Sequence, residues 1–206
     1  MKTPTENNAP DLPINIIYNE FVAKEKSDYI LIPVSISPDV NQEREGIFNR
    51  SEKKTKNYYN IIFYNKSDGK TSLLLDKEAI IKSFNFIEIQ KEDNSTQGFW
   101  LYKIIDKDTN NDNKLNHKDA IIGYISDSSG KNIRQITPDN TQLLNWQIIA
   151  SRGELLLKVL QDVDENKIFS EQDNATLIKI NLNKPQIGNE LIKDEIKQKI
   201  RSYIKK

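Results

Sequence analysis

The sequence predicts a mostly β protein, built from repeated antiparallel hairpins of the propeller-blade type and ending in one amphipathic helix. Short runs rich in Ile, Val, Leu, Tyr and Phe recur along the chain, and such runs favour strands. Turn signals such as Asp68-Gly69 separate neighbouring runs. Only after Gly188 does the spacing of the apolar residues become that of a helix.

Composition limits the class of protein. The chain has 206 residues, enough for one sizeable domain or two small ones, and its 30 basic residues balance its 30 acidic residues. A zero net charge argues against a nucleic-acid partner, which usually selects a basic excess. A hydrophobic content of 36% is low and predicts thin layers. The absence of cysteine excludes disulfides and thiolate metal sites, and no apolar run is long enough for a transmembrane segment.

The chain opens with a polar, linker-like segment. Residues 1–12 predict a disordered leader without a secretory signal. A β-repeat domain is expected over residues 13–188, with its first strands at 14–18 and 28–36. Residues 37–57 are polar and charged, which predicts a long exposed loop.

Further strands follow in pairs. They are expected at 58–64, 71–75, 80–81, 84–89, 99–105, 121–126, 132–136, 145–149, 154–160 and 175–182.

Between strands 99–105 and 121–126 lies a 12-residue segment, 108–119, hereafter the first loop. Oxygen-bearing side chains stand at its first, third, fifth, ninth and twelfth places, which is the ligand order of a Ca²⁺ loop of the EF-hand kind. Ca²⁺ takes oxygen ligands, and a short loop supplies them when alternate side chains turn inward. The candidate ligands are Asp108, Asn110, Asp112, the carbonyl of Lys114, Asn116 and Asp119. Asp106, just before the loop, could be a spare ligand, although a contribution to the negative potential is the simpler interpretation.

A second copy, the second loop, spans residues 162–173 between strands 154–160 and 175–182. Its candidate ligands are Asp162, Asp164, Asn166, the carbonyl of Ile168, Ser170 and Asp173. The sequence therefore predicts two Ca²⁺ sites.

Other loop positions carry structural expectations. Leu115 and Phe169, at the eighth place, are expected to anchor each loop in the core. The last four residues have N-cap spacing and predict one helical turn. The chain turns sharply at the sixth place, where Asn113 tolerates a left-handed conformation better than Lys167 does.

Both loops resemble EF-hand-like loops of the dockerin type, which also close with Asp, although the flanks here are strands instead of helices. The resemblance implies bound calcium. The alternative is that both segments are Asn- and Asp-rich hairpin loops without an ion, since these residues favour turns in any case.

The loops occupy matching places in a repeated unit, because Asp162 follows Asp108 by 162 − 108 = 54 residues. That offset is near the ~40–50-residue period of propeller blades. Residues 124–127, 130–138, Trp146 and Arg152-Gly153 resemble the TolB-type, WD40-like propeller repeat of bacterial envelope proteins, over about residues 99–182. The family usually has Asp-Gly where this chain has Arg152-Gly153. The resemblance implies an incomplete or small propeller, and at ~45 residues each the chain holds about four blades at most.

The last segment, 189–206, predicts an amphipathic helix. Ile192, Ile196, Ile200 and Tyr203-Ile204 recur at helical spacing with charged residues between them. We expect its apolar face to dock on the sheet, with a partner-binding or a membrane-surface helix as alternatives.

No catalytic constellation stands out. His117 lies at a non-ligand place of the first loop, and we expect it to be solvated. Trp100 and Trp146 lie in apolar runs, which predicts core packing over sugar stacking.

Two functions remain open. The first is a calcium-binding, non-enzymatic scaffold or binding module for a protein or glycan. Loops of this kind can work at millimolar Ca²⁺, which is found outside the cytosol, so the protein is expected to be exported: periplasmic, a cell-surface lipoprotein or secreted. The second is a polysaccharide hydrolase or lyase that uses Ca²⁺ to hold substrate. It would need a cleft with two carboxylates outside the loops, or a carboxylate and a tyrosine.

Overall fold

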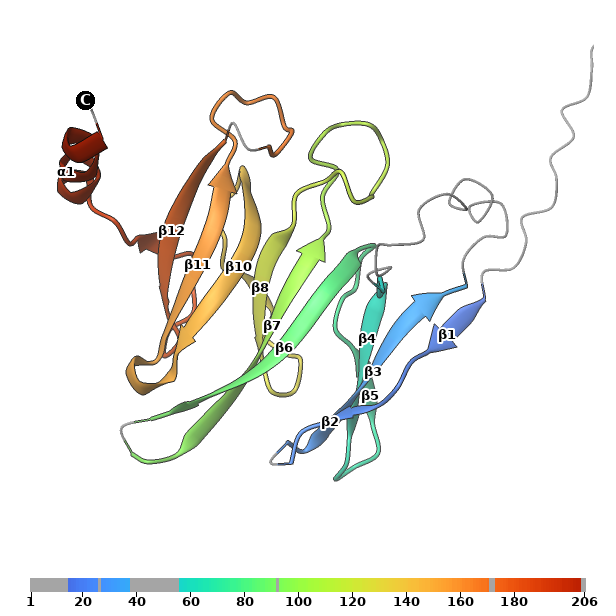
Figure 1. The fold of residues 1–206 in the computed structure, drawn as a ribbon. Helices are drawn as coiled ribbons and strands as arrows, with labels where there is room; N and C mark the ends of the chain where they lie inside the picture. Colours follow the sequence, from blue (N-terminus) through green and yellow to red (C-terminus); the bar gives the residue numbers. More distant parts are fainter. Residues whose placement is uncertain (1–14, 26, 38–55, 92, 171–172, 205–206) are drawn as a thin grey trace, which may run out of the picture.

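Three antiparallel sheets follow one another along the protein, and a single helix stands at the far end (Figure 1). The structure, a computed structural model, describes residues 15–25, 27–37, 56–91, 93–170 and 173–204. The expected leader and most of the expected exposed loop at 37–57 fall outside these residues.

Sheet A comes first and has the strand order β1-β3-β4-β5, with β2 pairing to β3. Its strands are β1 (Ile16–Tyr18), β2 (Val22–Ala23), β3 (Tyr29–Ile36), β4 (Asn60–Asn65) and β5 (Thr71–Leu73). The turn between β4 and β5 contains Gly69 with a φ of 70°, as the Asp-Gly signal predicts.

Sheets B and C share one plan, four strands in simple chain order. Sheet B contains β6 (Ile80–Gln90), β7 (Thr96–Ile105), β8 (Ile122–Asp127) and β9 (Arg134–Gln135). Sheet C contains β10 (Thr141–Ile149), β11 (Glu154–Gln161), β12 (Asn174–Asn181) and β13 (Asn189–Glu190), with a 3₁₀ turn, η2 (Ala150–Arg152), before β11.

Sheet B is the middle layer, and strand β7 is buried on both faces. Trp100 and Tyr102 join the core shared with sheet A, where they meet Phe63. Phe99 and Leu101 point the other way, into the core shared with sheet C. A continuous apolar run is what a strand with two covered faces requires.

Two bulges explain where the sequence periodicity breaks. In β6 the register shifts between Ile81 and Ser83, so Ile81 and the even-numbered Phe84 both pack against the core shared with sheet A. A bulge adds one residue and changes the parity of every residue after it. The sequence therefore predicts two strands, 80–81 and 84–89, where the structure has one.

The bulge in β10 lies between Leu143 and Asn145. The ammonium group of Lys103 donates a hydrogen bond to the carbonyl of Leu144 at this point. Burial lowers the pKa of Lys103. The carbonyl of Leu144 and the ring of Trp146, whose centroid is 5.4 Å from the ammonium nitrogen, stabilise the charged form of Lys103.

The mostly β class and the antiparallel hairpins are confirmed. The two-residue strands β2 and β13 were not expected from the sequence. The described residues form three stacked sheets and no closed ring, so the propeller itself stays a prediction.

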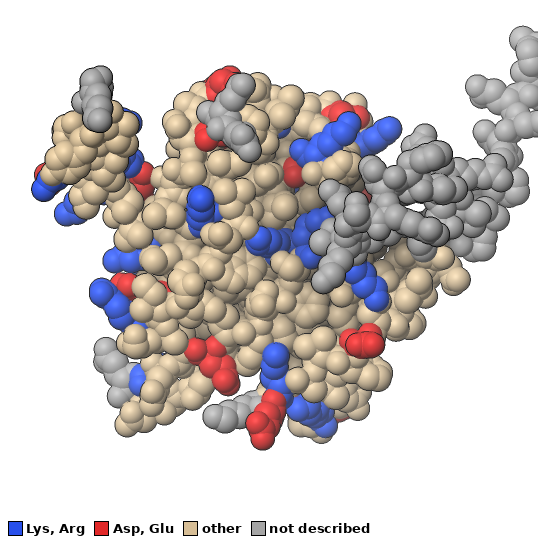
Figure 2. Space-filling model, viewed as in Figure 1, with Lys and Arg blue, Asp and Glu red and all other residues tan. Residues whose placement is uncertain are grey.

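The helix, α1 (Asp194–Ile204), forms within the expected segment 189–206, although the first two residues of that segment are strand β13. Its docking on the sheet is wrong, because none of its residues is buried and it stands clear of the body (Figures 1 and 2). The outer face of sheet C, which lies nearest, carries Glu154, Lys158 and Lys179 and offers the apolar stripe of the helix little to pack against.

The turn between β8 and β9 provides a test of the contact between sheets A and B. Gly130 has a φ of 79°, and a Cβ there would lie 2.5 Å from the ring of Phe63 in β4. Gly69 has a similar φ of 70°, but its nearest neighbour, the Tyr64 hydroxyl, is 3.8 Å away. We expect Gly69→Ala to destabilise the fold by about 1 kcal/mol through backbone strain alone.

Gly130→Ala should cost about 1–3 kcal/mol more, because it adds overpacking to the same strain. Urea unfolding of both variants measures the difference. Equal losses would mean that the turn does not pack on sheet A as described.

Candidate metal sites

The two loops occupy equivalent places in successive sheets. The first loop joins β7 to β8 and the second joins β11 to β12, in each case the second and third strands of the sheet. Both lie at the same end of the stack (Figure 1), and acidic side chains lie over this end (Figure 2). The strands that flank each loop are paired along their length, so the ends of both loops are held by the sheets.

In the first loop, carboxylates at the first and twelfth places organise the backbone. Asp108 accepts hydrogen bonds from the amides of Asn113 at 2.8 Å and Asp112 at 3.1 Å. Asp119 is 1% exposed and accepts from the amides of Thr109 and Asn116, each at 2.8 Å. Every one of these donors belongs to the loop itself, so the chain is wrapped around its own carboxylates.

The second loop repeats three of these four bonds at the same places. Asp162 accepts from the amide of Lys167 at 3.0 Å, which matches the bond from the sixth to the first place. Asp173 accepts from the amides of Ser170 at 2.8 Å and Val163 at 3.4 Å. Two different sequences thus adopt one hydrogen-bond framework.

The fifth-place side chains set the chain direction at the seventh place, where a carbonyl ligand is expected. Asp112 accepts from the amide of Lys114 at 3.0 Å, and Asn166 accepts from the amide of Ile168 at 2.7 Å. Each side chain thus holds the peptide group that directly precedes the predicted carbonyl ligand.

The backbone turns in the same way in both loops. Positive φ values occur at the fourth and sixth places, at 59° and 61° for Asn111 and Asn113 and at 57° and 64° for Glu165 and Lys167. Lysine adopts the left-handed conformation at a cost of roughly 1–2 kcal/mol, so the framework of the second loop imposes it. In the first loop the last four residues form one turn, closed by the amide of Asp119 donating to the carbonyl of Asn116. In the second loop the amide of Asp173 donates to the carbonyl of Ser170. The described residues that follow each loop lead into a strand and form no helix.

The second loop gathers carboxylates most tightly. Asp162, Asp164 and Asp173 each offer an oxygen within 4.8 Å of the others. At about 5 Å two such charges repel by roughly 3 kcal/mol at an effective dielectric constant near 20. One oxygen of Asp162, Oδ1, is buried without a hydrogen-bond partner. A cation would satisfy this oxygen and relieve the repulsion, so the residues fit the predicted ion.

The first loop is arranged differently. Its third place is the neutral Asn110, and its other carboxylate, Asp112, is at the exposed fifth place. No three acidic groups of this fully described loop come as close as the triad of the second. The residue at the sixth place favours the first loop as the metal site, whereas the arrangement of the carboxylates favours the second loop.

Two other predicted ligands need separate mention. Asn116 is half-buried, and its side-chain carbonyl accepts from the amide of Lys118 at 2.9 Å. Ser170, its counterpart, is also half-buried. The eighth-place residues Leu115 and Phe169 are half-buried and belong to neither main core.

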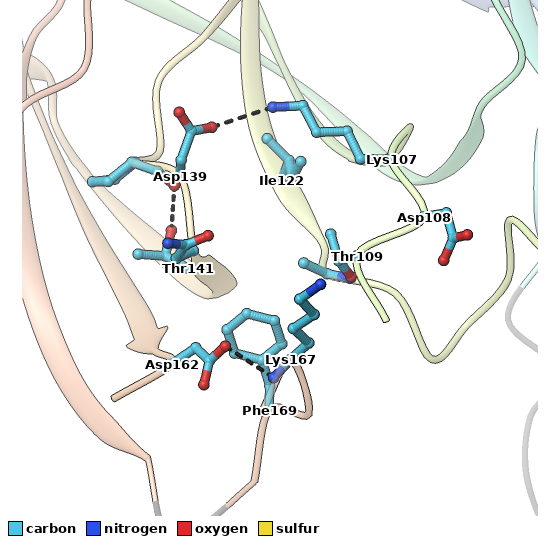
Figure 3. Close-up of a pocket in the computed structure, with 12 residues that line it drawn as sticks. Lys107, Asp108, Thr109, Ile122, Asp139, Thr141, Asp162, Lys167 and Phe169 are labelled. Atoms are coloured by element: carbon cyan, nitrogen blue, oxygen red, sulfur yellow. Dashed lines mark hydrogen bonds and ion pairs between the residues drawn. The ribbon is translucent and has the colours of Figure 1, made fainter. Parts of the chain in front are cut away.

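A cavity of about 380 Å³ lies between the loops (Figure 3). Asp108 and Thr109 line it from one side, and Asp162, Lys167 and Phe169 line it from the other. The residues at the first place of each loop, Asp108 and Asp162, thus border one shared space.

The cavity is bounded elsewhere by an ion pair. Lys107 Nζ lies 3.2 Å from Asp139 Oδ1. Hydrogen bonds from Gln135 and Lys107, with the charge of Lys107, lower the pKa of Asp139. This carboxylate therefore stays ionised under ordinary conditions.

Asp106 is a buried carboxylate just outside the first loop. Its side chain is 1% exposed and forms an ion pair with Lys77, and it accepts a hydrogen bond from the hydroxyl of Tyr124 at 2.7 Å. Burial, followed by this hydrogen bond, raises the pKa of Tyr124. The Oδ1 atom of Asp106 is buried and has no hydrogen-bond partner. Asp106 links β7 to β8 at the start of the first loop, a role that its position after an apolar run did not reveal.

The remaining candidates fall as follows. His117 is exposed. Trp100 is 1% exposed and packs against Phe86 with ring centroids 4.8 Å apart, which confirms core packing, while Trp146 is partly buried against the core shared by sheets B and C.

Comparison with known proteins adds no relative: no protein-family model, curated protein or solved structure matches the chain. The resemblances to dockerin-type loops and TolB-type repeats therefore stay predictions. Among the described residues, no helix has the length and apolar character needed to cross a membrane.

The strained sixth residue of the second loop can be tested directly. We expect Lys167→Gly to be more stable than Lys167→Ala by about 1 kcal/mol in EDTA, because glycine removes the left-handed strain while both changes remove the charge. Urea unfolding of the pair measures it.

Lys158, an exposed strand residue of β11, provides the matched control. There glycine should be the less stable of the pair, since it weakens a strand interior. The same sign at both positions would contradict the loop conformation described.

Proposed function

We propose that this protein is a calcium-binding β-repeat domain in which two ions fix the loops that join the second and third strands of successive sheets. The observation that carries the proposal is the triad Asp162, Asp164 and Asp173 with the buried, unpaired Oδ1 of Asp162. The same framework in the first loop supports a second site of the same kind.

Calcium is the cation that suits these donors. The loops offer carboxylate, amide, hydroxyl and carbonyl oxygens, the hard ligands that Ca²⁺ prefers, in the flexible geometry that Ca²⁺ accepts and Mg²⁺ does not. Asp108 and Asp162 would each bind at the first place. Asp119 and Asp173 would close the shells, as their hydrogen bonds already hold them across the loop.

The ions would act on stability. An ion that binds only the folded state stabilises it by mass action, and it also removes the repulsion among the carboxylates. Each loop connects two paired strands, β7 and β8 or β11 and β12. Ion binding in a loop would therefore also stabilise the pairing of those strands.

We further propose an exported scaffold or binding module for a protein or glycan, with blade-like sheets of the TolB type. Support for export comes from the open character of the loops, which suits millimolar Ca²⁺. Support for the blade comparison comes from the two four-stranded sheets with a loop at the same place in each.

The alternative, a polysaccharide hydrolase or lyase, requires a cleft with two carboxylates outside the loops or a carboxylate and a tyrosine. Of the carboxylates lining the cavity between the loops, only Asp139 lies outside them, and it is paired with Lys107. A second cavity, of about 260 Å³, carries Glu154 beside Lys179 and no tyrosine. No observation on these cavities favours the enzyme over the binding role.

Thermal melts test the calcium sites. Loops with dissociation constants of about 10⁻⁴–10⁻³ M should gain about 1.5–2.7 kcal/mol each in roughly 10 mM Ca²⁺. For a chain of this size that gain raises the melting temperature by about 3–10 °C per site. Asp108→Ala and Asp162→Ala should each remove part of the rise, and the double variant should remove it all.

Asp76→Ala is the matched control, because Asp76 is an exposed carboxylate with no hydrogen bond or ion pair among the described residues. It should keep the full rise. Replacing Ca²⁺ with Mg²⁺ should give a smaller one. If the double variant still responds to Ca²⁺ as the wild type does, the loops are polar turns and the proposal fails.

A further inference from the structure

The outer face of sheet A is apolar although no other sheet of the described residues covers it. Register places Ile16 beside Ile36 and Tyr18 beside Val34. Further along the same face, Ile32 of β3 lies beside Ile62 of β4, which lies beside Leu73 of β5. Directly opposed residues in an antiparallel pair share a face, so this surface, hereafter the A face, runs across four strands.

The A face is open in its outer parts. Tyr18 is 65% exposed, Leu73 62% and Ile16 56%. Neither hydrophobic core includes any residue of this face. The opposite side of the same strands is fully used, as Leu31, Ile61 and Phe63 are 0–1% exposed.

Sheet C ends the stack differently. Its outer face carries Glu154, Lys158 and Lys179 among its apolar residues, and Lys179 lies 3.5 Å from Glu154. Such a face is suited to water. One end of the stack is therefore polar and the other apolar.

Helix α1 is the second uncovered apolar surface. Ile196 and Ile200 are each 49% exposed, and Tyr203 and Ile204 are each 73% exposed. They lie on one face, at spacings of four, three and one residues. An isolated helix of 11 residues is marginal in water, so this one needs a surface to cover its apolar face.

The helix is held to its own chain only lightly. Lys197 pairs with Glu190 of β13, and this exposed pair lowers the pKa of Glu190. Exposed ion pairs contribute little to stability. The pair joins the first turn of the helix to β13 and leaves the apolar face of the helix available.

We propose that α1 of one copy packs on the A face of a second copy, so that the protein associates head to tail. The two surfaces lie at opposite ends of one molecule (Figure 1), so the helix cannot reach the A face of its own chain in this arrangement. A helix stripe on a sheet face is a standard layer of protein architecture. A contact between two different surfaces repeats in rings or open chains.

The size of the contact sets its strength. The exposed apolar parts of α1 and of the A face sum to on the order of 1,000 Å², the lower limit for a specific interface. Association is therefore expected to depend on concentration, with the copies separating when dilute. It involves neither loop, so it should occur equally in EDTA and in Ca²⁺.

Sedimentation velocity over a concentration series tests the proposal on the full chain. The wild type should rise from the monomer mass towards dimers and larger species. Ile196→Gln/Ile200→Gln, which removes the helix stripe with a good helix former, should stay monomeric. Tyr18→Lys/Leu73→Lys, which alters the A face, should also stay monomeric.

Matched controls alter the opposite sides of the same elements. Gln198→Ala/Ser202→Ala acts on the polar side of α1, and Ser72→Lys acts on the other side of β5, where Ser72 faces Phe63 in register. Both controls should associate like the wild type. Circular dichroism and melting temperature confirm that each variant folds.

Mixing the two monomeric variants gives the decisive result. The A-face variant keeps an intact helix and the helix variant keeps an intact A face, so together they can form one contact and should give a dimer that grows no further. If the helix variant alone still associates, the A face pairs with itself and the proposal is overturned. A wild type that stays monomeric at millimolar concentration overturns it as well.

Discussion

The two-sided packing of strand β7 is the constraint on which the rest of the structure depends. Phe99 and Leu101 fill one core while Trp100 and Tyr102 fill the other, so a single strand is the shared wall of both. Sheets A and C do not meet in either core and are connected through sheet B. Fully burying one such side chain is worth roughly 1.5–3 kcal/mol, and β7 concentrates this gain where both cores need it. The first loop begins three residues after β7 ends, so its carboxylates are positioned by the most firmly held strand of the protein.

Much of this arrangement could be predicted from the sequence. β-branched and aromatic runs located most of the strands, and the order of Asp and Asn located both loops. The bulges in β6 and β10 hid continuous strands, because an added residue reverses which side chains face the core and breaks the alternation on which the prediction rests. Strands β2 and β13 have two residues each, too few for any periodicity. The helix was found from its spacing, but spacing alone says that a face must be covered and not which surface covers it.

The loops show why a shared framework does not make the sites equal. Each has three carboxylates at ligand places: Asp108, Asp112 and Asp119 in the first, and Asp162, Asp164 and Asp173 in the second. The difference is that the middle one stands at the fifth place in the first loop and at the third place in the second. Carboxylates at the first, third and twelfth places converge within 4.8 Å, whereas the first loop has the neutral Asn110 at its third place and its three carboxylates form no such cluster. The sequence favoured the first loop because Asn113 suits the left-handed turn. The structure places Lys167 in the same turn, with φ 64°. The second loop therefore combines a small backbone strain with the tighter cluster of carboxylates.

The two ends of the stack differ in a way that fixes the direction in which a further layer can be added. Covering the outer face of sheet C would take Glu154, Lys158 and Lys179 out of water, and the effective penalty is several kcal/mol for each buried ion unless partners with good geometry replace the solvent. Covering the A face removes Ile16, Leu73 and their neighbours from water instead, which is favourable by about 25 cal/mol for each Å² of apolar surface. Sheet B already has both faces covered, and sheet A has an apolar outer face over which the described residues place no other sheet. A further layer is therefore opposed by the charges on the outer face of sheet C and favoured against the A face.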